Sequence, residues 1–329
     1  MTAVLDVADL RVGFPTAEGR VSAVRGVNLS VEPGRVLGVV GESGSGKTVT
    51  MLATLGLLPG SAEVTGSVRY KGRELLGLAP SELRKVRGSG IAMIFQDPRT
   101  SLNPVHTIGH QIVEGIRIHH PEVSRKDAAK RAVELLGLVG IPQPDRRARD
   151  YPHQFSGGMC QRAMIAMAVA NDPDVLVADE PTTALDVTIQ AQILDLLRDI
   201  RQEKGVAIVL ISHDLGVVAG LADEVAVMYA GRVVERGKVD DVYAQARHPY
   251  TRGLLASIPR LTDTNRGPLV SIGGGAPSLL HLPDGCAFHP RCAHERPNCR
   301  VDDPRLRPIG RVDAACHYAE EMGTVRVTP

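Results

Sequence analysis

Up to about residue 245 the chain alternates short apolar runs with amphipathic helical patterns. The apolar runs are rich in Val and Ile, which is typical of buried strands. They are Val36–Val40, Ile91–Phe95, Val175–Ala178, Val206–Ile211 and Val225–Tyr229. Helical patterns follow several of them, and Val187–Arg201 is the clearest, with apolar residues three to four positions apart. Strands that alternate with helices predict βαβ units, so the expected fold class is α/β with a mostly parallel sheet.

Two stretches break this rhythm. Residues 97–155 carry helical patterns such as Ala128–Leu138 but no convincing strand, which predicts a helical subdomain inserted into the α/β core. After residue 245 the share of Pro, Gly, Arg, His and Cys rises, and from Asn265 onward no regular element is expected. The pattern therefore predicts a domain over residues 1–245, with the helical subdomain at 97–155, and a small C-terminal region over 246–329.

Composition narrows the class of protein. Hydrophobic residues make up 43% and charged residues 23%, as in ordinary globular proteins. A formal net charge of +1 and an aromatic content of 3% argue against a nucleic-acid partner. We see no apolar run long enough for a transmembrane helix and no secretory signal at the N-terminus, so we expect a cytosolic protein whose five cysteines stay reduced.

A phosphate-binding loop follows the first apolar run. Residues 41–48, GESGSGKT, fit G-x-x-x-x-G-K-[ST] between the strand Val36–Val40 and the helical stretch Met51–Leu58. The glycines let backbone N–H groups and the helix N-terminus face a phosphate. Lys47 is expected to reach the β- and γ-phosphates, and the Thr48 hydroxyl to bind Mg²⁺. The candidate nucleotide-binding residues are Gly41, Ser43, Gly44, Ser45, Gly46, Lys47 and Thr48.

Two adjacent carboxylates end another apolar run. Val175–Ala178 is followed by Asp179 and Glu180. Asp179 is placed to hold the Mg²⁺ shell, as in other P-loop enzymes. Glu180 lies one residue further on, where a carboxylate can orient or deprotonate the attacking water. With the phosphate loop, this pair predicts a nucleotide hydrolase.

One motif separates this chain from other P-loop proteins. Phe155-Ser156-Gly157-Gly158-Met159, followed by Gln161-Arg162, resembles the signature motif of ABC ATPases. The resemblance covers about residues 4–245, and no guanine-reading Asn-Lys-x-Asp is seen, so ATP is favoured over GTP. It implies roles for further residues: Gln96 as the Q-loop residue and a Mg²⁺ ligand, Ala184-Leu185-Asp186 as the D-loop, His213 as the switch histidine, and Phe14 as the adenine-stacking aromatic.

The resemblance also implies a shared site. Ser156, Gly157 and Gly158 precede a helical run, so a helix N-terminus would face the γ-phosphate bound by a partner subunit. Closure of the two subunits would align Glu180 and water with that phosphate, while Gln96 and His213 sense it. Met159 replaces the more usual Gln of the motif, as in the peptide-importer branch. Cys160 is expected to be a small helix residue and not a catalytic thiol.

Two segments after the ATPase region point to that branch. Residues 248–255, HPYTRGLL, and the segment Phe288-His289-Pro290-Arg291-Cys292 resemble ATP-binding subunits of dipeptide, oligopeptide and nickel importers. The resemblance implies a peripheral subunit at the cytoplasmic face of the membrane that energises peptide import. Implied partners are two permeases, a second and non-identical ATP-binding subunit, and indirectly an extracytoplasmic solute-binding protein. Nickel or another small solute, and a homodimer, remain alternatives.

Four cysteines cluster in this tail. Cys286, Cys292, Cys299 and Cys316 follow the spacing C-x5-C-x6-C-x16-C, which suggests a metal site in a cytosolic chain. Zinc sites usually carry C-x2-4-C pairs, which this spacing lacks, and four thiolates can also hold an iron–sulfur cluster. Resemblance to the four-cysteine tail of the branch favours a [4Fe-4S] cluster. Zinc, with His289, His294 or His317 as further ligands, and no metal remain alternatives.

Two rival functions are less consistent with the chain. A translation or DNA-repair ABC ATPase usually carries two cassettes, a coiled-coil insertion or a basic surface. This chain has one cassette and no long heptad run, and its basic cluster Arg146-Arg147-Ala148-Arg149 is short and next to acids. A redox-sensing protein built around the tail would not need the intact hydrolytic set.

Overall fold

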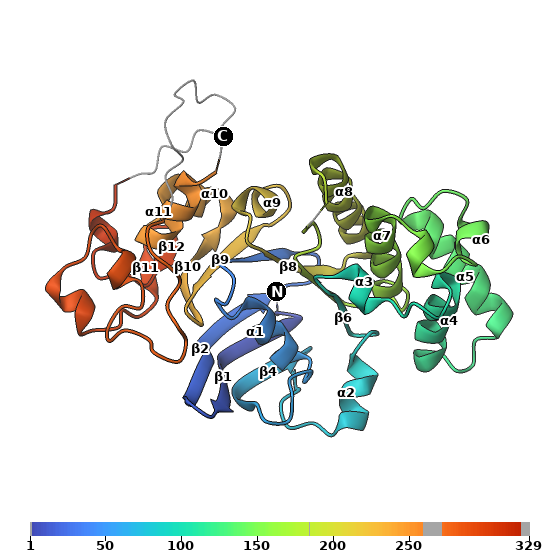
Figure 1. Ribbon diagram of the computed structural model, residues 1–329, viewed down its shortest axis with the longest axis horizontal. Coiled ribbons are helices and arrows are strands. Elements are labelled where there is room, and N and C mark those ends of the chain that lie inside the picture. The colour runs from blue at the N-terminus through green and yellow to red at the C-terminus, as the bar shows by residue number, and fades with distance from the viewer. Residues whose placement is uncertain (1, 184, 259–271, 324–329) are drawn as a thin grey trace. The chain divides into compact units, whose positions relative to one another are not determined.

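The computed structural model describes residues 2–183, 185–258 and 272–323 (Figure 1). Within them the chain divides into two compact units, which are described separately. The first unit is formed mainly by Gly77–Ile211. The second is formed mainly by Leu5–Ser30, Val36–Leu76 and the segment that follows residue 211.

The strands of the first unit are parallel. They are β6 (Ile91–Ile94), β7 (Val175–Asp179) and β8 (Ala207–Ser212), and β7 pairs with both neighbours. Every residue of β7 and β8 is buried. Burial on both faces explains why these strands read as continuous apolar runs and not as alternating ones. The predicted strand positions are confirmed to within one or two residues.

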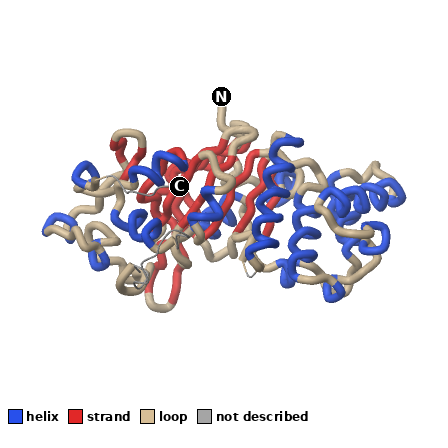
Figure 2. The backbone as a smooth tube through the Cα atoms, turned by 90° about the horizontal axis from the view of Figure 1, so that it is seen from above, coloured by secondary structure: helices blue, strands red, loops and turns tan. Residues whose placement is uncertain are grey.

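The helical insertion is also confirmed. Between β6 and β7 the described chain forms only helices: α3 (Pro98–Ser101), α4 (Ile108–His119), α5 (Arg125–Leu138), α6 (Pro144–Arg147), a 3-10 turn η1 (Pro152–Gln154) and α7 (Gly157–Ala168). Helices α4, α5 and α7 pack on one another, and Figure 2 shows this group without strands. The unit also contains α2 (Pro80–Val86) and α8 (Val187–Lys204), which the Asp186 carboxylate caps by accepting from Ile189 N at 2.9 Å.

The second unit contains an antiparallel sheet that the sequence pattern did not predict. Its order is β2-β1-β4-β5, formed by β1 (Leu5–Thr16), β2 (Gly19–Val31), β4 (Glu63–Tyr70) and β5 (Arg73–Glu74). Asp9 in β1 has a φ of 44°, and the pairing register with β4 shifts between Ala8 and Arg11. Such a bulge interrupts the alternation of apolar and polar residues by which a half-buried strand is recognised.

The phosphate loop belongs to a parallel pair in the same unit. β3 (Val36–Val40) runs parallel to β9 (Glu224–Tyr229), and β10 (Arg232–Lys238) is antiparallel to β9. The helices are α1 (Lys47–Thr54), α9 (Leu215–Ala219), α10 (Val239–Gln245) and α11 (Pro249–Ala256). Helix α1 begins four residues before the expected stretch, because its first turn is part of the phosphate motif.

The tail is more regular than expected. It contains 3-10 turns η2 (His289–Arg291), η3 (Pro297–Arg300) and η4 (Ala319–Glu321), and strands β11 (Arg307–Ile309) and β12 (Val312–Ala314). The expectation of no regular element after Asn265 is therefore wrong: β12 pairs antiparallel with both β10 and β11. Strands of three residues, one of them containing Pro308, are too short to show a period. Asn265 itself lies outside the described residues.

None of the helices in the described part of the chain is both long enough and apolar enough to cross a membrane.

Candidate functional site

The phosphate loop has the backbone that its glycines permit. Gly41, Gly44 and Gly46 have φ values of 154°, 78° and 98°. A Cβ on Gly41 would lie 2.2 Å from the Met228 carbonyl oxygen, and one on Gly46 would lie 2.5 Å from that of Ala23. Only glycine satisfies both the conformation and the space. The loop leads directly into α1, so the helix N-terminus follows the anion-binding turn.

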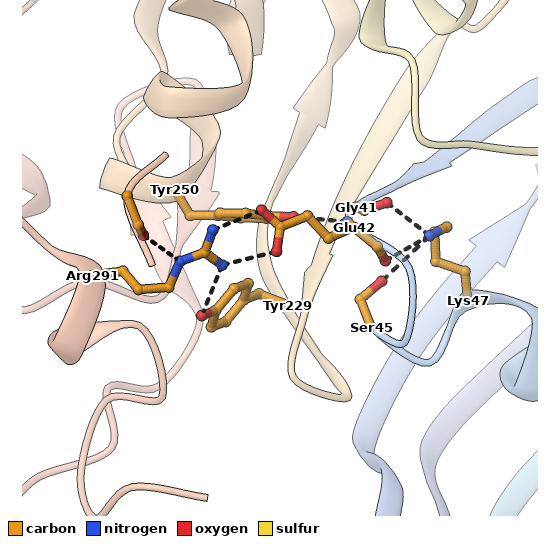
Figure 3. A network of polar contacts seen from close by, with 8 residues as sticks. Gly41, Glu42, Ser45, Lys47, Tyr229, Tyr250 and Arg291 are labelled. Carbon is orange, nitrogen blue, oxygen red and sulfur yellow. Dashed lines mark hydrogen bonds and ion pairs between the residues drawn. The ribbon is translucent and has the colours of Figure 1, made fainter. Parts of the chain in front are cut away.

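Lys47 folds back over this loop. Its Nζ donates to the carbonyl oxygens of Gly41 at 2.7 Å and Glu42 at 2.9 Å, and to Ser45 Oγ at 3.5 Å (Figure 3). The residue is only 5% exposed. A buried ammonium group whose hydrogen bonds go to backbone carbonyl oxygens can donate the same hydrogen bonds to phosphate oxygens when a nucleotide is present.

Of the other predicted residues in this unit, Phe14 lies half-buried in β1, and His213 is exposed directly after β8.

The predicted hydrolytic residues of the first unit lie together. Asp179, at the end of β7, is 2% exposed. Glu180 follows with a φ of 47°, and its backbone N–H donates to the Ile211 carbonyl at 2.9 Å. Its Oε2 accepts from Gln96 Nε2 at 2.9 Å and from Thr183 Oγ1 at 2.9 Å. A left-handed backbone is uncommon for Glu, and such conformations concentrate at functional sites.

The signature segment forms a capped helix start. Ser156 precedes α7, and its Oγ accepts from Met159 N at 3.3 Å. Ser156 is exposed, while Gly157 and Gly158 open the helix without side chains. Cys160 is buried in α7, and burial raises the pKa of its thiol, as expected for a small packing residue. Of the D-loop residues, Ala184 lies outside the described residues.

The four tail cysteines line one cavity. Cys286, Cys292, Cys299 and Cys316 surround it together with His248, His289, His294 and His317. Burial raises the pKa of Cys286 and of Cys316 to about 11, and the neighbouring thiols act in the same direction. Within the described ranges, no three or more His, Cys, Asp and Glu side chains are arranged to hold a single metal ion. The four thiols therefore share one cavity.

Sequence reasoning missed a network at the second loop residue. The Glu42 carboxylate pairs with Arg291 of the tail, and Glu42 N donates to the Tyr250 hydroxyl at 2.8 Å (Figure 3). Both partners lie inside the two segments that resemble the importer branch, at residues 248–255 and 288–292. Their position in those segments was the available signal, but nothing in the sequence connects them with the phosphate loop.

Comparison with known proteins identifies two regions. Residues 24–183 match the model of the ABC transporter family. Residues 234–299 match that of the C-terminal region of oligopeptide/dipeptide transporters. Dipeptide transport ATP-binding protein DppD of Bacillus subtilis is 51% identical over 319 residues, which cover 96% of this chain and 93% of that protein. The chain belongs to the ATP-binding proteins of the ABC transporter family.

Other members of the family support the same assignment. Oligopeptide transport ATP-binding protein OppD of Mycobacterium tuberculosis is 52% identical over 99% of this chain, which spans only 53% of that protein. An ATP-binding cassette solved as a dimer in a post-hydrolysis state with ADP and phosphate has a TM-score of 0.65 and 28% identity. The structural match covers 71% of this ABC protein and 98% of the solved cassette. The expected α/β fold of an ABC ATPase is thereby confirmed.

Proposed function

We propose that this chain is the ATP-hydrolysing subunit of an ABC importer that brings di- or oligopeptides across the cytoplasmic membrane. The observation that carries the proposal is the second match, since a C-terminal region of the oligopeptide/dipeptide type accompanies an ABC cassette in one chain. The cassette is assigned to residues 1–245, its helical subdomain to 97–155, and the extension to 246–329. Nickel or another small solute is the alternative, because an importer's specificity resides in its binding protein and permeases.

We assign nucleotide binding to the phosphate loop. Lys47 exchanges its carbonyl partners for the β- and γ-phosphate oxygens, and backbone N–H groups of the loop, with Ser43 and Ser45, surround the phosphates. Thr48, Asp179 and Gln96 hold Mg²⁺, and Phe14 stacks on adenine. The glycine backbone of the loop and the burial of Lys47 support this assignment.

We assign the catalytic step of hydrolysis to Glu180. Its carboxylate orients or deprotonates the attacking water, and the Gln96 amide and the Thr183 hydroxyl fix its position. Gln96 therefore links the γ-phosphate to the catalytic carboxylate, and His213 senses the same phosphate. Mg²⁺, when bound, neutralises charge that develops on the phosphate oxygens.

The complete site requires a second ATP-binding subunit. Ser156, Gly157 and Gly158 present the positive end of α7 to the nucleotide of the partner, and Asp186 lies at the same interface. The dimeric state of the similar cassette supports this arrangement. We further propose that the second subunit is non-identical, that two permeases anchor the pair at the cytoplasmic face of the membrane, and that a solute-binding protein acts from the opposite side.

The helical subdomain offers a surface for the permeases. A cavity of about 690 Å³ lies among α4, α5 and α6. Its apolar side chains include Val113, Ile118, Ala129 and Val133, and Ile118 is 69% exposed. The lining also includes charged residues, among them Glu114, Arg117 and Arg125. A groove of this size with apolar and charged side chains accommodates a short amphipathic helix, which is the kind of cytoplasmic segment a permease would present.

The tail is proposed to hold a [4Fe-4S] cluster through Cys286, Cys292, Cys299 and Cys316. A single zinc ion would draw four thiolates to within roughly 4 Å of one another, given Zn–S bonds of about 2.3 Å. A four-iron cluster would bind one thiolate at each of its corners, and the four thiols line one cavity. His289 Nδ1 lies 3.1 Å from Glu295 Oε1, and His317 Nε2 lies 2.8 Å from the Asp302 carbonyl oxygen. A zinc-ligating His commonly makes such a contact through its second ring nitrogen, so zinc with these residues stays the alternative.

ATP hydrolysis tests the proposal through two substitutions. Glu180→Gln keeps the size of the side chain and removes the base, so the variant should bind Mg-ATP normally and lose at least 100-fold in turnover. Lys47→Ala should weaken nucleotide binding itself, because it removes the cation that faces the phosphates. The measurement is phosphate release together with ATP binding in the assembled complex. Near wild-type turnover by Glu180→Gln would disprove the assigned role.

A further inference from the structure

The C-terminal extension reaches the phosphate loop through one arginine. Arg291 is the last residue of η2, between Cys286 and Cys292, and its side chain is only 7% exposed. Its Nη1 donates to Glu42 Oε2 at 2.8 Å, and its Nη2 donates to Glu42 Oε1 at 2.9 Å (Figure 3). Two parallel bonds of this kind are stronger and geometrically more specific than a single contact between charges.

The guanidinium group of Arg291 is fixed on its other sides. Its Nε donates to the Gly273 carbonyl at 2.9 Å, and its Nη1 donates to the Tyr229 hydroxyl at 3.3 Å. The group also lies 5.8 Å from the ring centroid of Tyr229 and 5.9 Å from that of Phe288. Because these contacts come from β9 and from the tail itself, Arg291 is held in place and defines the position of Glu42.

Glu42 transmits this position to the loop. Its N–H donates to the buried Tyr250 hydroxyl at 2.8 Å, and its carbonyl oxygen accepts from Lys47 Nζ at 2.9 Å. The side chain and the N–H of Glu42 are thus held by Arg291 and Tyr250, both beyond residue 245, while its carbonyl accepts within the loop, from Lys47 Nζ and from Ser45 N at 3.2 Å. A displacement of Glu42 would move a backbone carbonyl that positions the phosphate-binding lysine.

The charge of Glu42 gives the ion pair a second role. A carboxylate within an anion-binding loop repels the triphosphate, and the repulsion grows where solvent is excluded. The bidentate bond to Arg291 neutralises this carboxylate and directs it toward the extension. If Arg291 were replaced by an uncharged residue, the negative charge would remain in the loop without its partner.

We propose that Arg291 is a positioning residue of the nucleotide site, which neutralises and orients Glu42 so that the C-terminal extension sets the affinity for ATP. The inference rests on the proposed ATP-binding function. It assigns to the extension a part in nucleotide binding, although Arg291 lies 249 positions from Glu42 along the chain.

Binding of Mg²⁺ with a non-hydrolysable ATP analogue, AMP-PNP, to the full chain tests the proposal by calorimetry. Arg291→Met should raise the Kd roughly tenfold, equivalent to about 1.4 kcal/mol. Arg291→Lys, which keeps the charge but not the fork, should show an intermediate loss. Adding Glu42→Gln to Arg291→Met should recover the affinity to within about threefold of wild type, because the unpaired charge is then gone.

Arg296→Met is the matched control. Arg296 also lies in the tail, where it pairs with Glu321 and covers the Tyr318 ring, and it should leave the Kd unchanged. Wild-type affinity in Arg291→Met, or a double variant as weak as Arg291→Met alone, would overturn the inference. If Arg291→Met does not fold, Arg291→Gln with and without Glu42→Gln gives the same comparison, because glutamine also leaves the Glu42 charge without a cationic partner. A wild-type chain that does not bind the analogue would overturn the proposed function itself.

Discussion

Two serines perform the same local task at helix starts in the first unit. Ser156 Oγ accepts from Met159 N at 3.3 Å at the start of α7, and Ser124 Oγ accepts from Asp127 N at 3.1 Å at the start of α5. An N-cap of this kind contributes about 1 kcal/mol to stability. Only Ser156 belongs to the signature segment. Comparing substitutions of Ser156 and Ser124 therefore distinguishes a role in stability from a role in hydrolysis.

We therefore predict that Ser156→Ala and Ser124→Ala each lower the free energy of unfolding by about 1 kcal/mol. Turnover should fall at least fivefold in Ser156→Ala alone, because the lost hydroxyl would face the γ-phosphate of the partner subunit. Denaturant unfolding and phosphate release in the assembled complex give the two quantities. Equal turnover in the two variants would remove Ser156 from the proposed site.

Residues that act within one local motif could be predicted from sequence, and residues that act across the fold could not. Lys47 and Glu180 follow from motif spacing, whereas the hydrogen bond between Gln96 and Glu180 was not predicted, since these residues are far apart along the chain. Thr183 was not predicted, since a Thr beside a carboxylate carries no signal until the turn is seen. Arg291 was missed because its partner is 249 positions away.

At the scale of elements, the tail combines several short turns with a modest number of buried apolar side chains. One small cluster consists of Ile309, Ala314 and Ala319, with Cys316 packed against it, and Phe288, Val312 and Met322 are buried as well. Ordering such a segment costs conformational entropy that a modest apolar burial offsets only in part, and metal–thiolate bonds would supply further stabilisation. Burial keeps the pKa of Cys286 high without a metal, so binding must displace the protons.

The tail should therefore carry iron when it is purified without oxygen. We predict about four irons and four sulfides per chain, the stoichiometry of a [4Fe-4S] cluster. Changing any one of the four cysteines to Ser should remove most of the iron, whereas Cys160→Ser, a buried thiol in α7, should not. If the purified protein contained zinc and no acid-labile sulfide, the cluster assignment would be wrong but a metal would still hold the tail. If the tail were ordered without any metal, both the cluster and the zinc alternative would be disproved.

Strands buried on both faces could be located from the sequence, because continuous apolar runs such as β7 and β8 stand out from their surroundings. The antiparallel sheet of β1, β2, β4 and β5 could not, since a bulge at Asp9 interrupts its alternation. The β11–β12 hairpin was missed for a different reason: its short strands are stabilised by pairing with β10, and that pairing is not visible in local sequence.

At the scale of the whole molecule, the residues of the proposed ATP site are divided between the two units. The phosphate loop and His213 belong to the second unit, and Gln96, Asp179, Glu180 and the signature segment belong to the first. Family membership follows from motifs distributed over both units, which is why the α/β fold of an ABC ATPase was predictable. The solute was not, because the residues that select it are expected in other subunits.

The most direct test of the account is ATP-driven uptake of a labelled tripeptide into proteoliposomes that contain the permeases, both ATP-binding subunits and the binding protein. With the wild-type chain, the proteoliposomes should take up the peptide only when Mg-ATP is present on the side of the membrane where the ATP-binding subunits lie. Glu180→Gln should bind ATP yet abolish uptake, since import needs hydrolysis and release. Undiminished uptake with Glu180→Gln, or no peptide uptake by a wild-type complex that hydrolyses ATP, would contradict the account.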